Sequence, residues 1–196
     1  VCVRGKPLIK YQIEALHSVG ISEIAIVTGY MSEKFDCFSN SKFHNPNWMQ
    51  TNMAYSLTLA SSWLRQGPCI VSYSDIFYGT DILSRLIAST KTIAVGFDPN
   101  WYELWSSRFK NVLDDAETFS FDDRNMLIDI GQKANSISEI KGQYMGLIKL
   151  EPSGWNKIEE IIKTKLAQSI RNCHLTDVLQ ALVKSGIDIE AVPNFE

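Results

Sequence analysis

The stretch Ile70-Val71-Ser72-Tyr73-Ser74-Asp75-Ile76 decides the fold of this 196-residue chain. A short apolar run, typical of a buried strand, ends there in a serine and a carboxylate. Gly67-Pro68 precedes the run, and a helical pattern begins after Gly79. In a parallel α/β sheet, a polar residue just beyond the carboxyl end of a strand lies where ligands bind. Asp75 is therefore the first candidate for chemistry, although an aspartate that caps a turn leaves the same pattern.

The composition is that of a soluble globular protein of one domain, with 45% hydrophobic and 21% charged residues. The formal net charge of −3 and the scattered basic residues argue against charge-driven nucleic-acid binding. No apolar run approaches the roughly 20 residues that span a bilayer, and no signal-peptide pattern is recognised. The cysteines show neither C-x-x-C nor histidine at metal-ligand spacing, which predicts reduced thiols in a cytoplasmic protein.

Helical and strand patterns alternate around the Asp75 stretch. The first helix follows Pro7 and ends before Gly20. The order helix, strand, helix, strand, helix, strand implies parallel strands with right-handed crossovers. Helices are predicted over residues 8–19, 32–38, 53–64 and 80–89, and strands over 24–28, 70–73 and 92–97.

The second half begins with weak alternation over residues 117–130, which breaks at 122–125 and predicts a hairpin. No repeat, low-complexity segment or linker is present. We therefore predict a single domain over residues 1–196 with three-layer α/β/α architecture. The remaining predicted elements are a strand at 147–150, helices at 153–168 and 175–184, and a last strand at 188–192.

Two further features suit a ligand site. Gly29-Tyr30 follows the predicted strand 24–28, and glycine there lets a ligand approach the backbone, although a tight turn explains it equally well. Thr51-Asn52 precedes a helix. The local pattern favours an N-cap, while the same helix N-terminus can hold an anion or a base edge.

An acidic pair, Asp115 and Glu117, follows three aromatic residues within 101–105. Strand residues two apart point the same way, so both carboxylates can face one pocket, and with aromatic faces they suit a cationic amine. Composition alone favours a solvated acidic turn beside buried tryptophans. Arg108 either clamps a phosphate or pairs with a nearby aspartate. No Ser/His/Asp or Cys/His set is recognisable, and Thr176-Asp177 is simplest as a helix start.

Taken in order, these segments resemble the nucleotidyltransferases of the sugar-phosphate pyrophosphorylase superfamily. Within it they are most similar to small bacterial cytidylyltransferases that act on phosphocholine, 2-aminoethylphosphonate or phosphoglutamine. Each piece alone is weakly specific, whereas the ordered set is specific and spans nearly the whole chain. The matching pieces are Gly5-Lys6-Pro7-Leu8-Ile9, Tyr11-Gln12-Ile13, Val27-Thr28-Gly29-Tyr30, Asn45-Pro46, Thr51-Asn52-Met53, Ser56-Leu57, Tyr73-Ser74-Asp75-Ile76, Trp101 to Phe109, Asp115-Ala116-Glu117 and Gly142-Gln143-Tyr144-Met145-Gly146.

The resemblance implies a Rossmann-like α/β domain with a mixed, mainly parallel sheet. It implies that Asp75 holds a catalytic Mg²⁺ between the nucleotide phosphates. An amine-bearing or quaternary ammonium acceptor would lie near Arg108, Asp115, Glu117 and Tyr144. The nucleotide site would be lined by Gly29, Tyr30, Thr51, Asn52, Ser56 and Ser74.

The sequence also departs from the family pattern. Its glycine-rich G-x-G-x-R loop, the following Pro-Lys and a second metal-binding aspartate are not found in residues 1–196. Lys6 belongs to the later Gly-Lys-Pro segment and is not assigned as the catalytic lysine. We therefore expect these residues alone to be badly impaired, and a longer parent protein to be an ordinary enzyme.

The resulting hypothesis is transfer of CMP from CTP to a small phosphate- or phosphonate-bearing acceptor in the cytoplasm, serving a bacterial surface glycan. A hexose-1-phosphate nucleotidylyltransferase that uses UTP or dTTP is the alternative enzyme. A catalytically inactive nucleotide-binding regulatory subunit is the alternative of another class. We expect neither a nucleic acid nor a membrane as partner, and the sequence leaves open a homo-oligomer.

Overall fold

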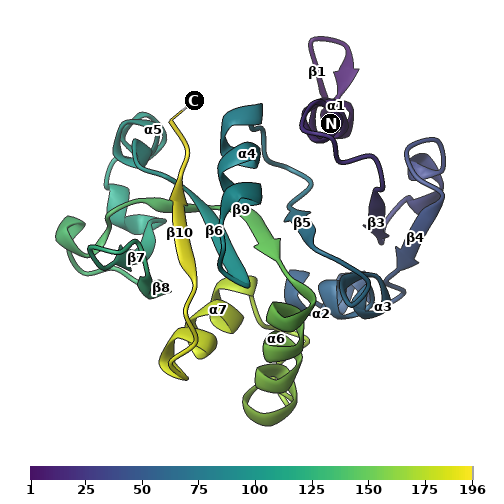
Figure 1. Ribbon diagram of the computed structural model, residues 1–196. Helices are drawn as coiled ribbons and strands as arrows, with labels where there is room; N and C mark the ends of the chain where they lie inside the picture. The colour runs from purple at the N-terminus through teal and green to yellow at the C-terminus, as the bar shows by residue number, and fades with distance from the viewer. Residues whose placement is uncertain (196) are drawn as a thin grey trace.

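A four-stranded mixed sheet forms the centre of the computed structural model, which describes residues 1–195 (Figure 1). The strand order is β10-β6-β9-β5. β5 (Cys69–Ser72), β6 (Ile93–Asp98) and β10 (Glu190–Pro193) run in one direction, and β9 (Gln143–Leu150) runs against its two neighbours. The predicted α/β class with a mixed, mainly parallel sheet is thereby confirmed.

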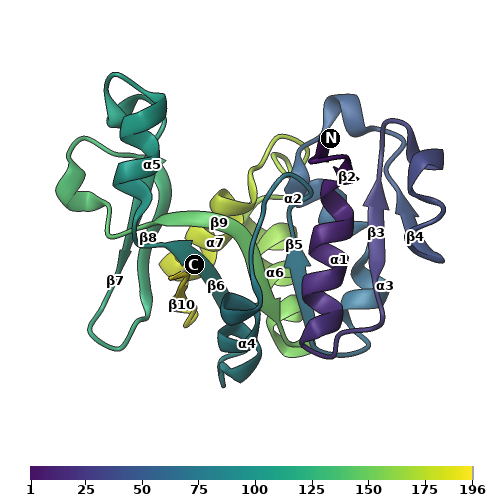
Figure 2. The same cartoon turned by 90° about the horizontal axis from the view of Figure 1, so that it is seen from above.

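Helices cover both faces of this sheet (Figure 2). α1 (Leu8–Ser18) and α4 (Thr80–Ala88) lie on one face, and α6 (Pro152–Lys165) and α7 (Leu175–Lys184) lie on the other. The three-layer arrangement is therefore the one expected from the alternating pattern. The loops that follow the carboxyl ends of the parallel strands are then free to form a ligand site.

The central strand β6 shows why the sheet is stable between two helical layers. Its residues 93–97 are all buried, and successive side chains point to opposite faces. Ala94 packs in the cluster of Leu83 from α4, and Val95 packs in the cluster of Trp155 from α6. A continuous apolar strand is what burial on both faces requires.

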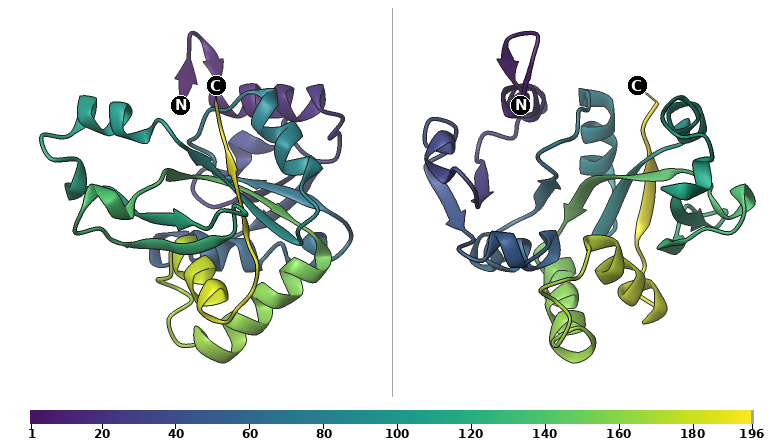
Figure 3. Two further views of the ribbon diagram at one scale, coloured as in Figure 1. Left: turned by 60° about the vertical axis from the view of Figure 1, so that its left-hand side comes forward. Right: turned by 180° about the vertical axis from the view of Figure 1, so that it is seen from behind.

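Two small sheets flank the central one on opposite sides (Figure 3). β3 (Ala25–Thr28) pairs in parallel with β4 (Ser41–His44), and β7 (Glu117–Phe121) forms the predicted hairpin with β8 (Leu127–Lys133). The strand predicted at 24–28 therefore exists as β3, but it lies outside the four-stranded sheet, and its apolar run is not a fully buried strand. It is mostly half-buried, because one of its edges has no strand neighbour in the part of the chain described.

The single helix predicted over residues 53–64 is two short helices, α2 (Met53–Thr58) and α3 (Ser61–Leu64). The Thr58 hydroxyl donates to the carbonyl of Tyr55 at 2.6 Å. At the break the backbone N–H groups of Leu59 and Ala60 donate three residues back, to Ser56 and Leu57, so the chain tightens into a 3₁₀-like turn there.

Several elements were not predicted from sequence. The aromatic cluster forms a helix, α5 (Trp101–Arg108), and the predicted helix at 32–38 is a short 3₁₀ turn. No helix in residues 1–195 combines the length and apolar character needed to cross a membrane. The further elements are the strands β1 (Cys2–Val3) and β2 (Lys6–Pro7) and the 3₁₀ turns Ser32–Phe35, Trp48–Gln50, Val112–Asp114 and Ile137–Glu139.

Candidate active site

The turn that follows β5 carries Asp75 at the mouth of a cleft of about 1190 Å³. Ser74 and Asp75 are both exposed, and both line the cleft. Across it lie Gly29 and Ser56, two of the predicted nucleotide-site residues. The structure therefore brings together, around one opening, residues that the sequence placed on three separate segments.

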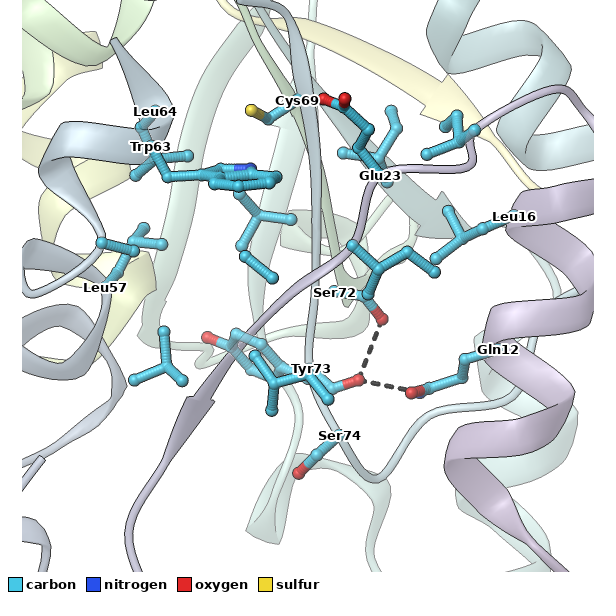
Figure 4. Close-up of a pocket in the computed structure, with 18 of the residues that line it drawn as sticks. Gln12, Leu16, Glu23, Leu57, Trp63, Leu64, Cys69, Ser72, Tyr73 and Ser74 are labelled. Carbon is cyan, nitrogen blue, oxygen red and sulfur yellow. Dashed lines mark hydrogen bonds between the residues drawn. The ribbon is translucent and has the colours of Figure 1, made fainter. Parts of the chain in front are cut away.

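The side chain of Gln12 on α1 holds this turn from both sides of Asp75, and Figure 4 shows its bond to Tyr73. Its amide nitrogen donates to the carbonyl of Tyr73 at 2.9 Å and to the carbonyl of Ile76 at 2.8 Å. The Ser72 hydroxyl donates to the same Tyr73 carbonyl at 2.9 Å. Gln12 is only 7% exposed, so its two donors are committed to the turn. It is a positioning residue for Asp75.

Asn45 organises the second wall of the cleft. It is 1% exposed, and its amide nitrogen donates to the hydroxyl oxygens of Thr51 and Ser56, each at 2.9 Å. Its carbonyl oxygen accepts from the backbone N–H of Asn47 at 2.9 Å. This buried amide therefore fixes two of the residues predicted for the nucleotide site.

Asn52 stands at the start of α2, but its side chain does not cap the helix. The amide nitrogen donates to the carbonyl of Asn172 at 2.8 Å, and its backbone N–H donates to the carbonyl of Arg171 at 2.7 Å. The local expectation of a side-chain cap was therefore wrong. A loop from the far end of the chain competes for the amide and ties the start of α2 to the segment before α7.

Gly29 is required by packing. A Cβ atom at this position would lie 2.7 Å from the Cβ of Trp48, closer than real contacts allow. The Tyr30 ring packs against the Trp48 ring with centroids 5.3 Å apart, and both side chains remain exposed. Tyr30 after β3 and Trp48 after β4 thus form an aromatic pair, and Trp48 lines the cleft.

The acidic cluster lies where β7 begins. Glu117 is the first residue of β7, whereas Asp115 lies in the turn before it, so the two do not share a strand as expected. Desolvation raises the pKa of Glu117, and the charges of Asp177 and Asp115 raise it further. The charge of His174 and a hydrogen bond from Thr176 lower it. The negative charges of Asp177 and Asp115 therefore act on Glu117, and the charge of His174 partly offsets their effect on its pKa.

Tyr73 connects the Asp75 turn to this acidic cluster. Burial raises its pKa, and the charges of Glu117 and Asp75 both raise it further. Its ring stands edge-on to the ring of Tyr144, with centroids 5.9 Å apart. Gly146 makes this possible, because its φ is +77° and a Cβ there would lie 2.5 Å from the Tyr73 ring.

Arg108 lies apart from these groups, exposed at the end of α5. It forms no ion pair within residues 1–195, so the pairing with a neighbouring aspartate is not observed and the phosphate clamp stays a prediction. Trp101, the first residue of α5, is buried, and Trp105 is half-buried against the same cluster. This agrees with the alternative in which the tryptophans serve packing.

Sequence reasoning missed Gln12, Asn45 and His174 as parts of the site. Gln12 had a usable signal, because it shares one helix face with Leu8 and Leu16 and is polar among apolar neighbours. Asn45 appeared only among the pieces that resemble the family, with no role assigned, and His174 offered no comparable signal. Their partners become apparent only when the chain is folded.

A magnesium ion is consistent with the residues at this opening. Within residues 1–195, no three His, Cys, Asp or Glu side chains are grouped so as to hold a metal. Mg²⁺, however, is commonly bound by one or two carboxylates together with substrate phosphates. A single exposed carboxylate, Asp75, fits an ion that is shared with a nucleotide.

Comparison with known proteins identifies the family, although no family model matches. The CTP:phosphoglutamine cytidylyltransferase of Campylobacter jejuni is 33% identical over an alignment that covers 96% of this chain and 81% of that protein. The choline-phosphate cytidylyltransferase of Streptococcus pneumoniae is 41% identical over 39% of the chain and 35% of that protein. The solved inositol-1-phosphate CTP transferase from T. maritima shares the fold with a TM-score of 0.75 at 15% identity, over 98% of this chain and 75% of that one. The chain therefore belongs to the cytidylyltransferases of the nucleotidyltransferase superfamily.

Proposed function

We propose that this protein transfers CMP from CTP to a small phosphorylated acceptor that carries a cationic amine, and releases pyrophosphate. The observation that supports it best is that Tyr73 is close enough to two acids on separate segments for both of their charges to raise its pKa. These acids are Asp75 at the cleft and Glu117 at the start of β7. A metal-bound nucleotide and an amine-bearing acceptor would meet near this tyrosine.

In the proposed reaction, a phosphate or phosphonate oxygen of the acceptor attacks the α-phosphorus of CTP. The bond from that phosphorus to the bridging oxygen breaks in line, and the electron pair leaves with pyrophosphate. Asp75 would hold Mg²⁺, which neutralises developing charge on the phosphates when bound. Gln12 keeps the Asp75 turn in one position, and such preorganisation is the main contribution a protein makes to this chemistry.

The acceptor preference is argued from charge. Burial raises the pKa of Glu117, and repulsion from the charges of Asp177 and Asp115 raises it further. A bound ammonium group relieves that repulsion and gains cation–π attraction from tyrosine faces such as that of Tyr144. A neutral sugar phosphate offers neither gain. Among the acceptors of the related enzymes, phosphoglutamine is the first to test, since the Campylobacter enzyme matches most of this chain.

The test is pyrophosphate release by the purified full-length parent protein with Mg²⁺, crossing CTP, UTP, ATP and dTTP with phosphoglutamine, phosphocholine, aminoethylphosphonate and glucose-1-phosphate. Release with CTP and an amine-bearing acceptor alone supports the proposal and identifies the substrate. Release with UTP or dTTP and glucose-1-phosphate assigns the protein to the sugar nucleotidylyltransferases instead. No release, with nucleotide still raising the melting temperature, indicates a binding subunit.

A further inference from the structure

The hairpin of β7 and β8 is joined to the segment that leads into β9 by main-chain contacts at Phe119. Phe119 bridges Ile140 in parallel, and the N–H of Lys141 donates to the Phe119 carbonyl at 2.7 Å. Glu117 lies two residues earlier in β7. Residues two apart in a strand direct their main-chain groups to the same edge, so the backbone of Glu117 also faces the β9 side.

At Glu117 the side-chain amide of Gln143 makes the contacts in place of a main chain. Its Oε1 accepts from the N–H of Glu117 at 3.3 Å, and its Nε2 donates to the Glu117 carbonyl at 2.6 Å. One amide thus bonds both main-chain groups of one residue, as a neighbouring strand does. Gln143 is 6% exposed, and Nε2 also donates to the carbonyl of Gly142 at 3.2 Å, so both of its donors are committed.

The backbone of Gln143 is anchored in the central sheet. Gln143 is the first residue of β9 and pairs with Asp98 of β6. The preceding Gly142 lies so close to β6 that a Cβ atom there would be 2.3 Å from the Phe97 ring. Because the backbone on this side is fixed by β6, the Gln143 side chain ties Glu117 to the position of the central sheet.

This tie connects two residues that were predicted to contact the acceptor. Tyr144 follows Gln143 in β9, and Glu117 begins β7 directly after the turn that contains Asp115. Glu117 therefore has a turn, not a strand, on its N-terminal side. The Gln143 amide is the printed contact that fixes the start of β7 against the strand that carries Tyr144.

We propose that Gln143 is a positioning residue for acceptor binding, whose amide clamps the backbone of Glu117 and so fixes its carboxylate relative to Tyr144. This inference rests on the proposed function and deepens it, because it assigns a role to a side chain that acts through Glu117. If the clamp is lost, a smaller fraction of molecules holds Glu117 in place, and the apparent affinity for the acceptor falls with that fraction. CTP binding, which depends on the cleft around Asp75, should change little.

The test compares Gln143→Met and Gln143→Asn with wild type in the full-length parent protein. Methionine lacks both hydrogen-bonding groups, and asparagine keeps the amide on a side chain one methylene shorter. We expect both variants to raise the KM of the acceptor that the wild type uses, among phosphoglutamine, phosphocholine and aminoethylphosphonate, about tenfold. The KM for CTP should change by less than about twofold, and deuterium exchange at the Glu117 N–H should accelerate about tenfold.

Gln180→Met is the control, because Gln180 is also buried and also makes two hydrogen bonds, to Asp129 and to the N–H of Ile130. It should leave the acceptor KM and the exchange at Glu117 unchanged.

Unchanged exchange in the Gln143 variants shows that Glu117 is held without Gln143 and overturns the proposal. Faster exchange with a wild-type acceptor KM, or an equal rise of both KM values, shows a purely structural role and also overturns it. If the wild type releases pyrophosphate with none of the acceptors, the proposed function fails, while exchange at Glu117 still decides whether Gln143 is the clamp.

Discussion

Replacing Gln12 with methionine removes both hydrogen bonds to the Asp75 turn with little change in side-chain volume. The Tyr73 carbonyl keeps the Ser72 hydroxyl as a partner, so losing one of its bonds costs about 1 kcal/mol. The Ile76 carbonyl loses the Gln12 amide, which costs about 1–3 kcal/mol. We expect Gln12→Met to lower the free energy of unfolding by about 2–4 kcal/mol, and the melting temperature by roughly 4–16 °C.

Urea unfolding measures this loss, and pyrophosphate release against Mg²⁺ concentration measures the positioning role. Gln12→Met should lower kcat and raise the Mg²⁺ concentration needed for half-maximal rate. Gln180→Met is the matched control, because Gln180 is also buried and also bonds twice, to Asp129 and to the N–H of Ile130. If both variants lose similar stability and neither changes the Mg²⁺ requirement, Gln12 has only a structural role and the positioning argument is refuted.

Three further substitutions test the site. Asp75→Asn should abolish pyrophosphate release while changing the unfolding free energy by no more than about 0.5 kcal/mol, since Asp75 is exposed; retained turnover contradicts its role. Gly146→Ala should destabilise by about 1–3 kcal/mol in urea, because φ is +77° and the new Cβ meets Tyr73; an unchanged midpoint refutes the packing argument. Folding raises the pKa of Glu117, so its ionisation costs stability as pH rises through that pKa. Glu117→Gln should therefore be more stable than wild type at pH 7 but not below the unfolded pKa of about 4, and equal urea midpoints at pH 7 count against the cluster.

The elements that sequence predicted well are those whose signal is local. The helix at 175–184 has bounds identical to those of α7, because its apolar residues recur at helical spacing and Asp177 accepts from the N–H of His174 at its start. β6 was predicted from a continuous apolar run, and the hairpin of β7 and β8 from its break at 122–125. Asp75 was singled out for its position after a strand, and the structure places it at the cleft mouth.

What sequence could not supply is the partner of each polar group. Gln12 bonds carbonyls 61 and 64 residues away, and Asn52 bonds a carbonyl 120 residues away. The sequence alone fits other roles equally well. Gln12 could be a polar residue on the surface of α1, and Asn52 could cap α2 with its side chain. Only the folded contacts decide between them. For the same reason, local periodicity identified β3 as a strand but could not show which edge of it is paired.

The position of Asp75 is set by bonds from two directions. On one side the last residues of β5 are tied to β9, where the N–H of Tyr73 donates to the carbonyl of Gly146 at 2.9 Å. From α1, Gln12 fixes the turn that follows. Neither set of bonds involves the Asp75 carboxylate itself, so Gln12→Met tests the placement of Asp75 while leaving its side chain unchanged.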